Sequence, residues 1–173
     1  MRAREIYHIS FFTNWLNNLH QTDYAIDDGH TDEDSPVDVI LRSKKTDQII
    51  NIQNVAYRGG VVHKTGTSNI PGLRPVMALG MHMSKNERKK SILNTIASKE
   101  NKYPEEIVKN LVLVIEVTIP RVDPDILKEL FQKSIETNFR GVYFVQLEIP
   151  MYSDGDPYAP TGFVYPLKQI NDV

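Results

Sequence analysis

The chain has 173 residues, of which 40% are hydrophobic and 24% charged, and its formal net charge at pH 7 is −2. These values predict one soluble globular domain and exclude a protein that is basic over its whole surface. The absence of cysteine excludes disulfides, cysteine-ligated zinc and thiol catalysis. No apolar run reaches the roughly 20 residues of a membrane helix, and the amphipathic N-terminal segment is unlike a secretory signal, so we expect a cytoplasmic protein.

The first predicted element is an amphipathic helix over residues 3–20. Its apolar side chains recur at spacings of three and four: Ile6, Ile9, Phe12, Leu16 and Leu19. Residues 23–27 predict a short strand or a turn. The acidic stretch 27–35 predicts a loop that ends at Pro36.

Residues 36–55, with the sequence PVDVILRSKKTDQIINIQNV, predict a β-hairpin. We expect a strand near 37–42, a turn over 43–47 and a second strand near 48–57. The amides Asn51 and Gln53 interrupt an otherwise apolar second strand. Such amides face a cleft or pair with one another; the alternative is that they bond to neighbouring strands or lie on an exposed edge.

Residues 58–83 are punctuated by glycine and proline and predict a long loop with at most one short strand, at 61–64. Ser84 and Glu87 form a capping-box signature, so a helix should run from 85 to about 100. Ile92, Leu93, Ile96 and Ala97 form its predicted buried face. Pro104 predicts a shorter helical turn after it.

The second half of the chain predicts two buried strands with a helix between them. LVLVIEV at 111–117 is a continuous apolar run, which is typical of a strand covered on both faces. Asp123 and Pro124 predict a helix start. A second buried strand is predicted at 142–149, followed by an irregular, surface-packed tail over 150–173.

The predicted order is helix, three strands, helix, strand, helix, strand. It predicts a single α/β domain whose central mixed β-sheet is flanked by helices on both faces, with a core over about 3–149. This order, together with the hairpin in which Pro36 and Asp38 precede polar positions on the next strand, resembles the restriction-endonuclease-like (PD-(D/E)XK) nucleases. The resemblance covers most of the chain and implies an α-β-β-β-α-β-α-β core.

In that family an Asp on one strand and a Glu-x-Lys on the next hold a divalent cation, usually Mg²⁺, and activate the attacking water. The resemblance therefore implies Asp38 as a metal ligand and catalytic residue, Gln53 at the Glu position, and Glu5 as an acidic residue on the opening helix. A register shifted by two places the motif on Asn51 instead. The alternative interpretation makes Asp38 a turn residue and Glu5 a solvated helix residue.

The sequence departs from the family motif at the positions that carry the chemistry. Mg²⁺ prefers carboxylate oxygens, and Gln53 offers only a neutral carbonyl. Val55 cannot replace the lysine. We therefore favour loss of catalysis over relocation of the lysine to Lys64, Lys89 or Lys90.

Charge is distributed unevenly along the chain. Residues 21–38 contain seven acidic residues and no Lys or Arg, whereas residues 57–90 contain seven basic residues and Glu87 alone. This asymmetry predicts an anion-binding face, and a pair of solvated surfaces is the alternative. The candidate nucleic-acid contacts are Arg58, Lys64, Lys85, Arg88, Lys89 and Lys90.

Two functional hypotheses follow. The favoured one is a catalytically degenerate, nuclease-like protein that binds DNA or RNA, or that acts as a scaffold for a protein partner through the tail 150–173. The alternative is an active Mg²⁺-dependent endonuclease that hydrolyses phosphodiester bonds.

Overall fold

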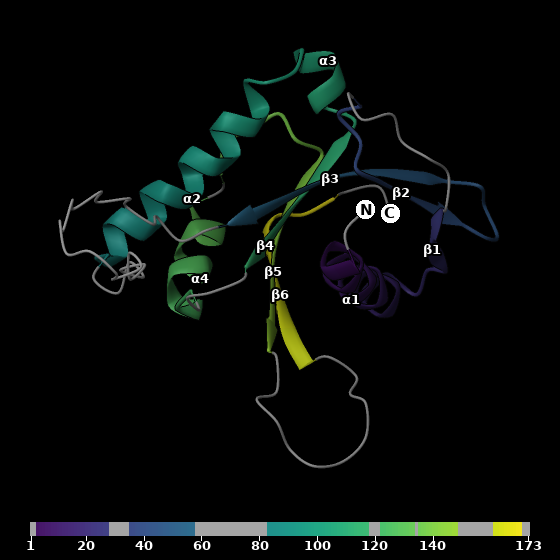
Figure 1. Cartoon of the computed structure of the whole chain (residues 1–173), viewed down its shortest axis with the longest axis horizontal. Coiled ribbons are helices and arrows are strands. Elements are labelled where there is room, and N and C mark those ends of the chain that lie inside the picture. The colour runs from purple at the N-terminus through teal and green to yellow at the C-terminus, as the bar shows by residue number, and fades with distance from the viewer. Residues whose placement is uncertain are drawn as a thin grey trace, which may run out of the picture.

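The computed structural model of the chain describes residues 3–27, 35–57, 83–117, 122–133, 135–148 and 161–170. Within these ranges a single six-stranded sheet has helices on both of its faces (Figure 1). The predicted mixed α/β class, with a central sheet flanked by helices, is therefore confirmed. Residues 28–34 of the loop predicted over 27–35, and residues 58–82 of the loop predicted over 58–83 with its short strand at 61–64, lie outside the described residues.

The described helices are α1 (Ala3–His20), α2 (Lys85–Glu100), α3 (Glu105–Val108) and α4 (Pro124–Gln132). The strands are β1 (Tyr24–Asp27), β2 (Val39–Ser43), β3 (Ile49–Tyr57), β4 (Leu111–Val117), β5 (Gly141–Glu148) and β6 (Thr161–Lys168). None of these helices combines the length and the apolar character that a membrane span requires.

The strands lie in the sheet in the same order as in the chain, β1 to β6. β1, β2 and β3 form an antiparallel meander, which confirms the predicted hairpin between β2 and β3. β3, β4 and β5 are parallel, so the chain must cross over between them, and helices α2 and α3 and then α4 lie in these crossovers. β6 returns antiparallel to β5.

Helix α1 covers one face of the sheet. Its buried stripe of Ile9, Phe12 and Leu16 belongs to the same core as the even-numbered residues Ile50 and Ile52 of β3. The ring of Phe12 lies 4.9 Å from that of Tyr143 on β5, measured between centroids. The predicted apolar spacing therefore fits the helix to the sheet at these three residues, whereas Leu19 of the predicted stripe is exposed.

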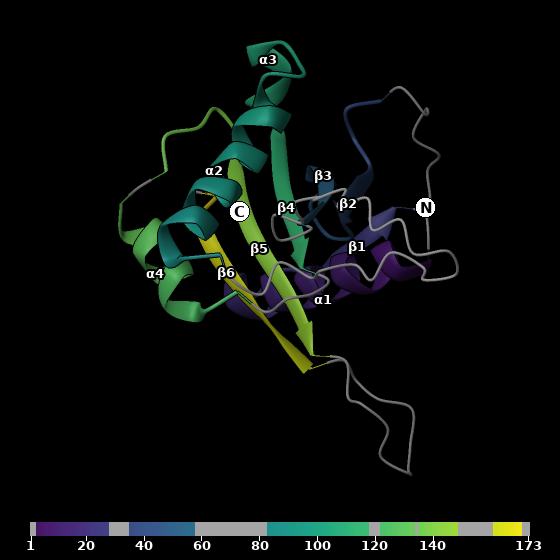
Figure 2. The same ribbon diagram turned by 60° about the vertical axis from the view of Figure 1, so that its left-hand side comes forward.

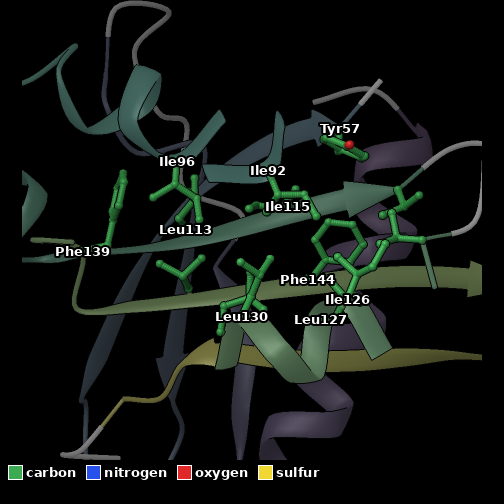
Figure 3. Packing of buried hydrophobic residues seen from close by; sticks show 14 of the residues in the cluster. Tyr57, Ile92, Ile96, Leu113, Ile115, Ile126, Leu127, Leu130, Phe139 and Phe144 are labelled. Atoms are coloured by element: carbon green, nitrogen blue, oxygen red, sulfur yellow. The ribbon is translucent and has the colours of Figure 1, made fainter. Parts of the chain in front are cut away.

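Helices α2 and α4 cover the opposite face (Figure 3). Ile92 and Ile96 of α2 and Leu127 of α4 pack with Leu113 and Ile115 of β4. All seven residues of β4 are buried because successive side chains point into alternate cores. This confirms that LVLVIEV is a strand covered on both faces.

The predicted irregular tail is wrong over residues 161–170. Thr161–Lys168 forms the edge strand β6 beside β5 (Figure 2), so the core extends beyond residue 149. Leu167 and Ile170 are buried, and the backbone N–H of Ile170 donates to the Tyr143 hydroxyl at 2.9 Å. Pro166 is tolerated because an edge strand can contain a residue without an N–H, and the pairing register shifts beside it.

Two helices begin with side-chain caps that fix where they start. The Ser84 hydroxyl accepts from the backbone N–H of Glu87, and the Glu87 carboxylate accepts from the backbone N–H of Ser84, as predicted. The backbone N–H and the hydroxyl of Ser84 both donate to the Glu87 carboxylate, and these two hydrogen bonds hold the pKa of Glu87 below its usual value. At α4, the Asp123 carboxylate accepts from the N–H of Asp125.

Candidate functional site

Asp38 lies at the entrance of β2, beside β3. Its backbone N–H donates to the Ile52 carbonyl at 2.8 Å, and its carboxylate accepts from the Asn54 backbone N–H at 2.7 Å. The next residue, Val39, pairs with Ile52, so Asp38 lies immediately before the paired part of β2. The structure thus brings the predicted aspartate next to the predicted amide strand, with an exposed carboxylate.

Gln53 points away from solvent. Only 2% of its surface is exposed, and its side-chain oxygen has no hydrogen-bond partner among the described residues. By strand alternation it shares the sheet face of Asn51, Val55 and Tyr57, where Val55 and Tyr57 pack in the core under α2 and α4. Both registers implied by the resemblance therefore place the motif on the α2 face of the sheet.

The polar residues of the opposite face form a cluster that the sequence interpretation missed. The Asn54 side-chain amide donates to Glu116 Oε2 on β4 at 3.2 Å, and His8 Nδ1 on α1 lies 3.2 Å from the same oxygen. The His8 and Glu116 side chains are almost fully buried. We call His8, Asn54, Glu116 and the adjoining Asp38 the polar centre.

Two signals in the sequence point to the polar centre. Glu116 is the single charged residue of the apolar run LVLVIEV, and burial of a carboxylate requires a partner. His8 lies beside Ile9 in the apolar stripe of α1, so it faces the same core. Neither signal is specific alone, because His8 and Glu116 are 108 positions apart in the sequence and their contact forms only in the folded chain.

The donor set of the polar centre does not fit Mg²⁺. Within the described ranges no three His, Asp or Glu side chains are grouped so that they could hold a metal ion. Glu116 Oε2 already accepts a hydrogen bond from the Asn54 amide and lies 3.2 Å from His8 Nδ1. Mg²⁺ would instead require near-octahedral coordination by oxygen atoms. Glu5 lies in α1, but its side chain is outside the described part of the structure, as are Arg58 and Lys64.

A groove of about 380 Å³ opens where the N-termini of α2 and α4 approach β6. We call it the aromatic groove. Its walls carry the cations Lys85 and Arg88, the acid Asp123 and the rings Phe163 and Tyr165. These two rings lie on one face of β6 with their centroids 6.1 Å apart.

The two rings differ in exposure. Phe163 is 48% exposed, whereas Tyr165 packs against the core beneath α2 and α4. Burial raises the pKa of Tyr165 above its ordinary value. Nearby, the side chain of Gln146 accepts from the Val122 backbone N–H at 3.2 Å and fixes the chain entering α4.

The carboxylate of Asp123 offsets part of the positive charge of the aromatic groove. Lys85 Nζ lies 3.6 Å from Asp123 Oδ2, and both side chains are largely exposed. Such exposed pairs contribute little to stability, so Lys85 can exchange Asp123 for an anionic ligand at small cost.

A second groove, of about 500 Å³, runs between α2 and β3. We call it the α2 groove. Val55 lines it together with the polar side of α2, including the acid Glu87, the lysines Lys90 and Lys99, and Asn94. Met83 lines both grooves, so they meet at the start of α2.

The structure separates the predicted basic contacts. Lys85 and Arg88 line the aromatic groove, and Lys90 lines the α2 groove. Lys89 lines neither groove; it forms an ion pair with Glu129 of α4 and holds the pKa of that carboxyl below its usual value. Lys99, which lines the α2 groove, was not among the predicted contacts.

Comparisons with protein-family models, curated proteins and solved structures found no match to this chain.

Proposed function

We propose that this protein is a nuclease-like domain that binds nucleic acid without hydrolysing it. The observation that carries the proposal is the pair of adjoining grooves along α2, whose walls include Lys85, Arg88, Lys90 and Lys99. Contacts between phosphate groups and the cationic side chains of lysine and arginine supply most of the affinity of nucleic acids for proteins. The whole chain has a formal net charge of −2. The basic groups on this one helix therefore form a local positive region on a protein that is slightly acidic in total.

The geometry of α2 supports contact with more than one phosphate. A helix rises 1.5 Å per residue, so the backbone positions of Lys90 and Lys99 lie about 13 Å apart along its axis. Ser91, Asn94 and Ser98 lie between them on the same groove wall. Hydroxyl and amide side chains of this kind, with lysines, are usual phosphate contacts.

Two further observations support the nuclease-like part of the proposal. The order of elements up to β5 is the order implied by the resemblance, with α3 as an additional short helix. Asp38 also lies at the start of the hairpin strand, against β3, where the resemblance requires it. The loss of hydrolysis is supported by Gln53, which offers a buried neutral amide at the position where the family has its metal-binding glutamate.

The scaffold hypothesis has less support. It depended on a tail that packs on the surface and could bind a partner. The part of this tail between 161 and 170 supplies an edge strand and two buried core residues, Leu167 and Ile170. It is therefore needed to build the domain.

Fluorescence anisotropy with labelled oligonucleotides tests the proposal. We expect binding that weakens as salt rises, and the double variant Lys90→Glu/Lys99→Glu should bind about tenfold more weakly or worse, with a salt slope shallower by about two. Lys44→Glu/Lys45→Glu is the matched control, because it makes the same charge change in the exposed β2–β3 turn. No binding by the wild type at low salt, or equal losses in both variants, would contradict the proposal.

Incubation of the same oligonucleotides with Mg²⁺ or Mn²⁺ tests the absence of hydrolysis. We expect intact substrates with both metals. Cleavage that Asp38→Ala abolishes would instead assign the protein as an active endonuclease.

A further inference from the structure

Phe163 is exposed in an unusual setting. The large hydrophobic side chains that are exposed in the described ranges are Tyr7, Leu19, Ile49, Leu93, Phe131 and Phe163. Of these, Phe163 is the one that lines either of the two grooves described above, and its groove also contains Lys85 and Arg88. Isolated exposed hydrophobics need no explanation, but an exposed ring within a cationic groove is the arrangement of a ligand platform.

The chemistry of the aromatic groove selects among anionic ligands. A flat ring contributes stacking energy only to a flat ligand, and cations contribute only to an anion. Nucleic-acid bases attached to phosphates satisfy both conditions, and base–aromatic stacking contributes about 1–3 kcal/mol per base. The volume of about 380 Å³ lies in the range of pockets that hold small organic groups.

We infer that the aromatic groove binds an unpaired base, so that the preferred ligand is a single strand whose base stacks on Phe163. The inference rests on the proposed function and specifies its ligand. Bases within a duplex are stacked on their neighbours and cannot present a face to the ring. The protein therefore discriminates single strands from duplexes at this position.

The position of the two grooves gives the path of the strand. Met83 lines both grooves, so a strand whose base occupies the aromatic groove can continue over the start of α2 into the α2 groove. Lys85 and Arg88 then lie beside the phosphates that flank the stacked base. Lys90 and Lys99 bind the following backbone independently of whether the bases are paired.

Affinities of a single strand and of the matching duplex for a Phe163→Ala variant test this inference. Loss of stacking should weaken single-strand binding about 5- to 160-fold, which corresponds to the contribution of one base, and should leave duplex binding unchanged. Phe163→Trp retains a flat ring and should keep the wild-type affinity. Phe131→Ala is the control, because Phe131 is 44% exposed on α4 but lines neither groove.

A strand that contains 2-aminopurine provides a direct readout of stacking. Its fluorescence should be quenched by the wild-type protein and by Phe163→Trp, but not by Phe163→Ala. If the wild type binds strands and duplexes equally and Phe163→Ala changes neither affinity, this inference fails while the proposed function stands. If the wild type binds neither nucleic acid, the proposed function itself fails.

Discussion

The side-chain amide of Asn54 donates a hydrogen bond to the carboxylate of Glu116, 3.2 Å away on the neighbouring parallel strand. Asn54 pairs in register with Val114, so Glu116 is two residues further along the same face. The backbone N–H of Asn54 binds the carboxylate of Asp38 at the same time. One neutral residue therefore connects two acidic groups from distant parts of the sequence.

Asn54→Asp should destabilise the domain. It replaces a donor with a carboxylate 3.2 Å from that of Glu116, in a site where burial weakens solvation. Two carboxylates at this distance repel each other, and Glu116 loses a hydrogen bond as well. We expect the free energy of unfolding at neutral pH to fall by about 2–4 kcal/mol, measured by urea denaturation.

The same variant should acquire a response to divalent cations. The polar centre would then contain three carboxylates, Asp38, Asp at position 54 and Glu116, and hard cations bind such oxygens. Mg²⁺ or Ca²⁺ should restore part of the lost stability of Asn54→Asp and should leave Asn54→Ala unchanged. Equal effects of the cation on both variants would show that the three groups do not converge.

Truncation after residue 160 should unfold the domain. It removes β6 together with Leu167 and Ile170, which are buried in opposite cores, and the hydrogen bond to Tyr143. Circular dichroism should show loss of the cooperative thermal transition. Truncation after Ile170 is the control and should retain the transition, because it keeps every contact described here.

Patterns within a single element were predictable, and contacts between distant elements were not. The capping box at Ser84 and the proline at α4 each act within one turn of chain, so sequence alone located both helices. Sequence alone did not show which face of β3 packs against α1, because Asn51, Gln53 and Asn54 place polar side chains on both faces of the strand. Packing of Ile50 and Ile52 against α1 decides it, and this depends on residues about 40 positions away.

Two other differences have the same physical origin. Pro166 suggested irregular structure, yet an edge strand beside β5 accommodates it, and edge position is a property of the whole sheet. Lys89 looked like one of several equivalent cations on α2, but Glu129 is 40 residues away and becomes its partner only when α4 packs beside α2. Sequence patterns therefore identified the cationic helix but not which of its lysines face the grooves.

Asp123→Asn should tighten binding of nucleic acid. Asp123 Oδ2 is 3.6 Å from Lys85 Nζ at the aromatic groove. The carboxylate therefore competes with a phosphate group for Lys85, and its negative charge also repels the phosphate. Asparagine is as good an N-cap as aspartate, and α4 should therefore remain intact. We expect severalfold higher affinity at low salt by anisotropy, whereas Asp125→Asn, in the first turn of α4 and outside the groove, should change affinity less.

The Lys89–Glu129 ion pair should make the α2–α4 contact sensitive to acid. The hydrogen bond from Lys89 lowers the pKa of Glu129 below the ordinary 4.5, so folding favours its charged form. This contribution is fully present above pH 4.5 and is lost as the pH falls through the lowered value.

Urea midpoints of the wild type and of Glu129→Gln, measured from neutral to acidic pH, check this dependence. The wild type should be more stable at neutral pH, and the difference should shrink below the ordinary pKa of 4.5 as Glu129 takes up a proton. In a Lys89→Met background the hydrogen bond is absent, so Glu129→Gln should give a difference that hardly varies with pH. A difference that persists undiminished in acid for the wild-type background would mean that Glu129 is held by packing and not by its charge on Lys89.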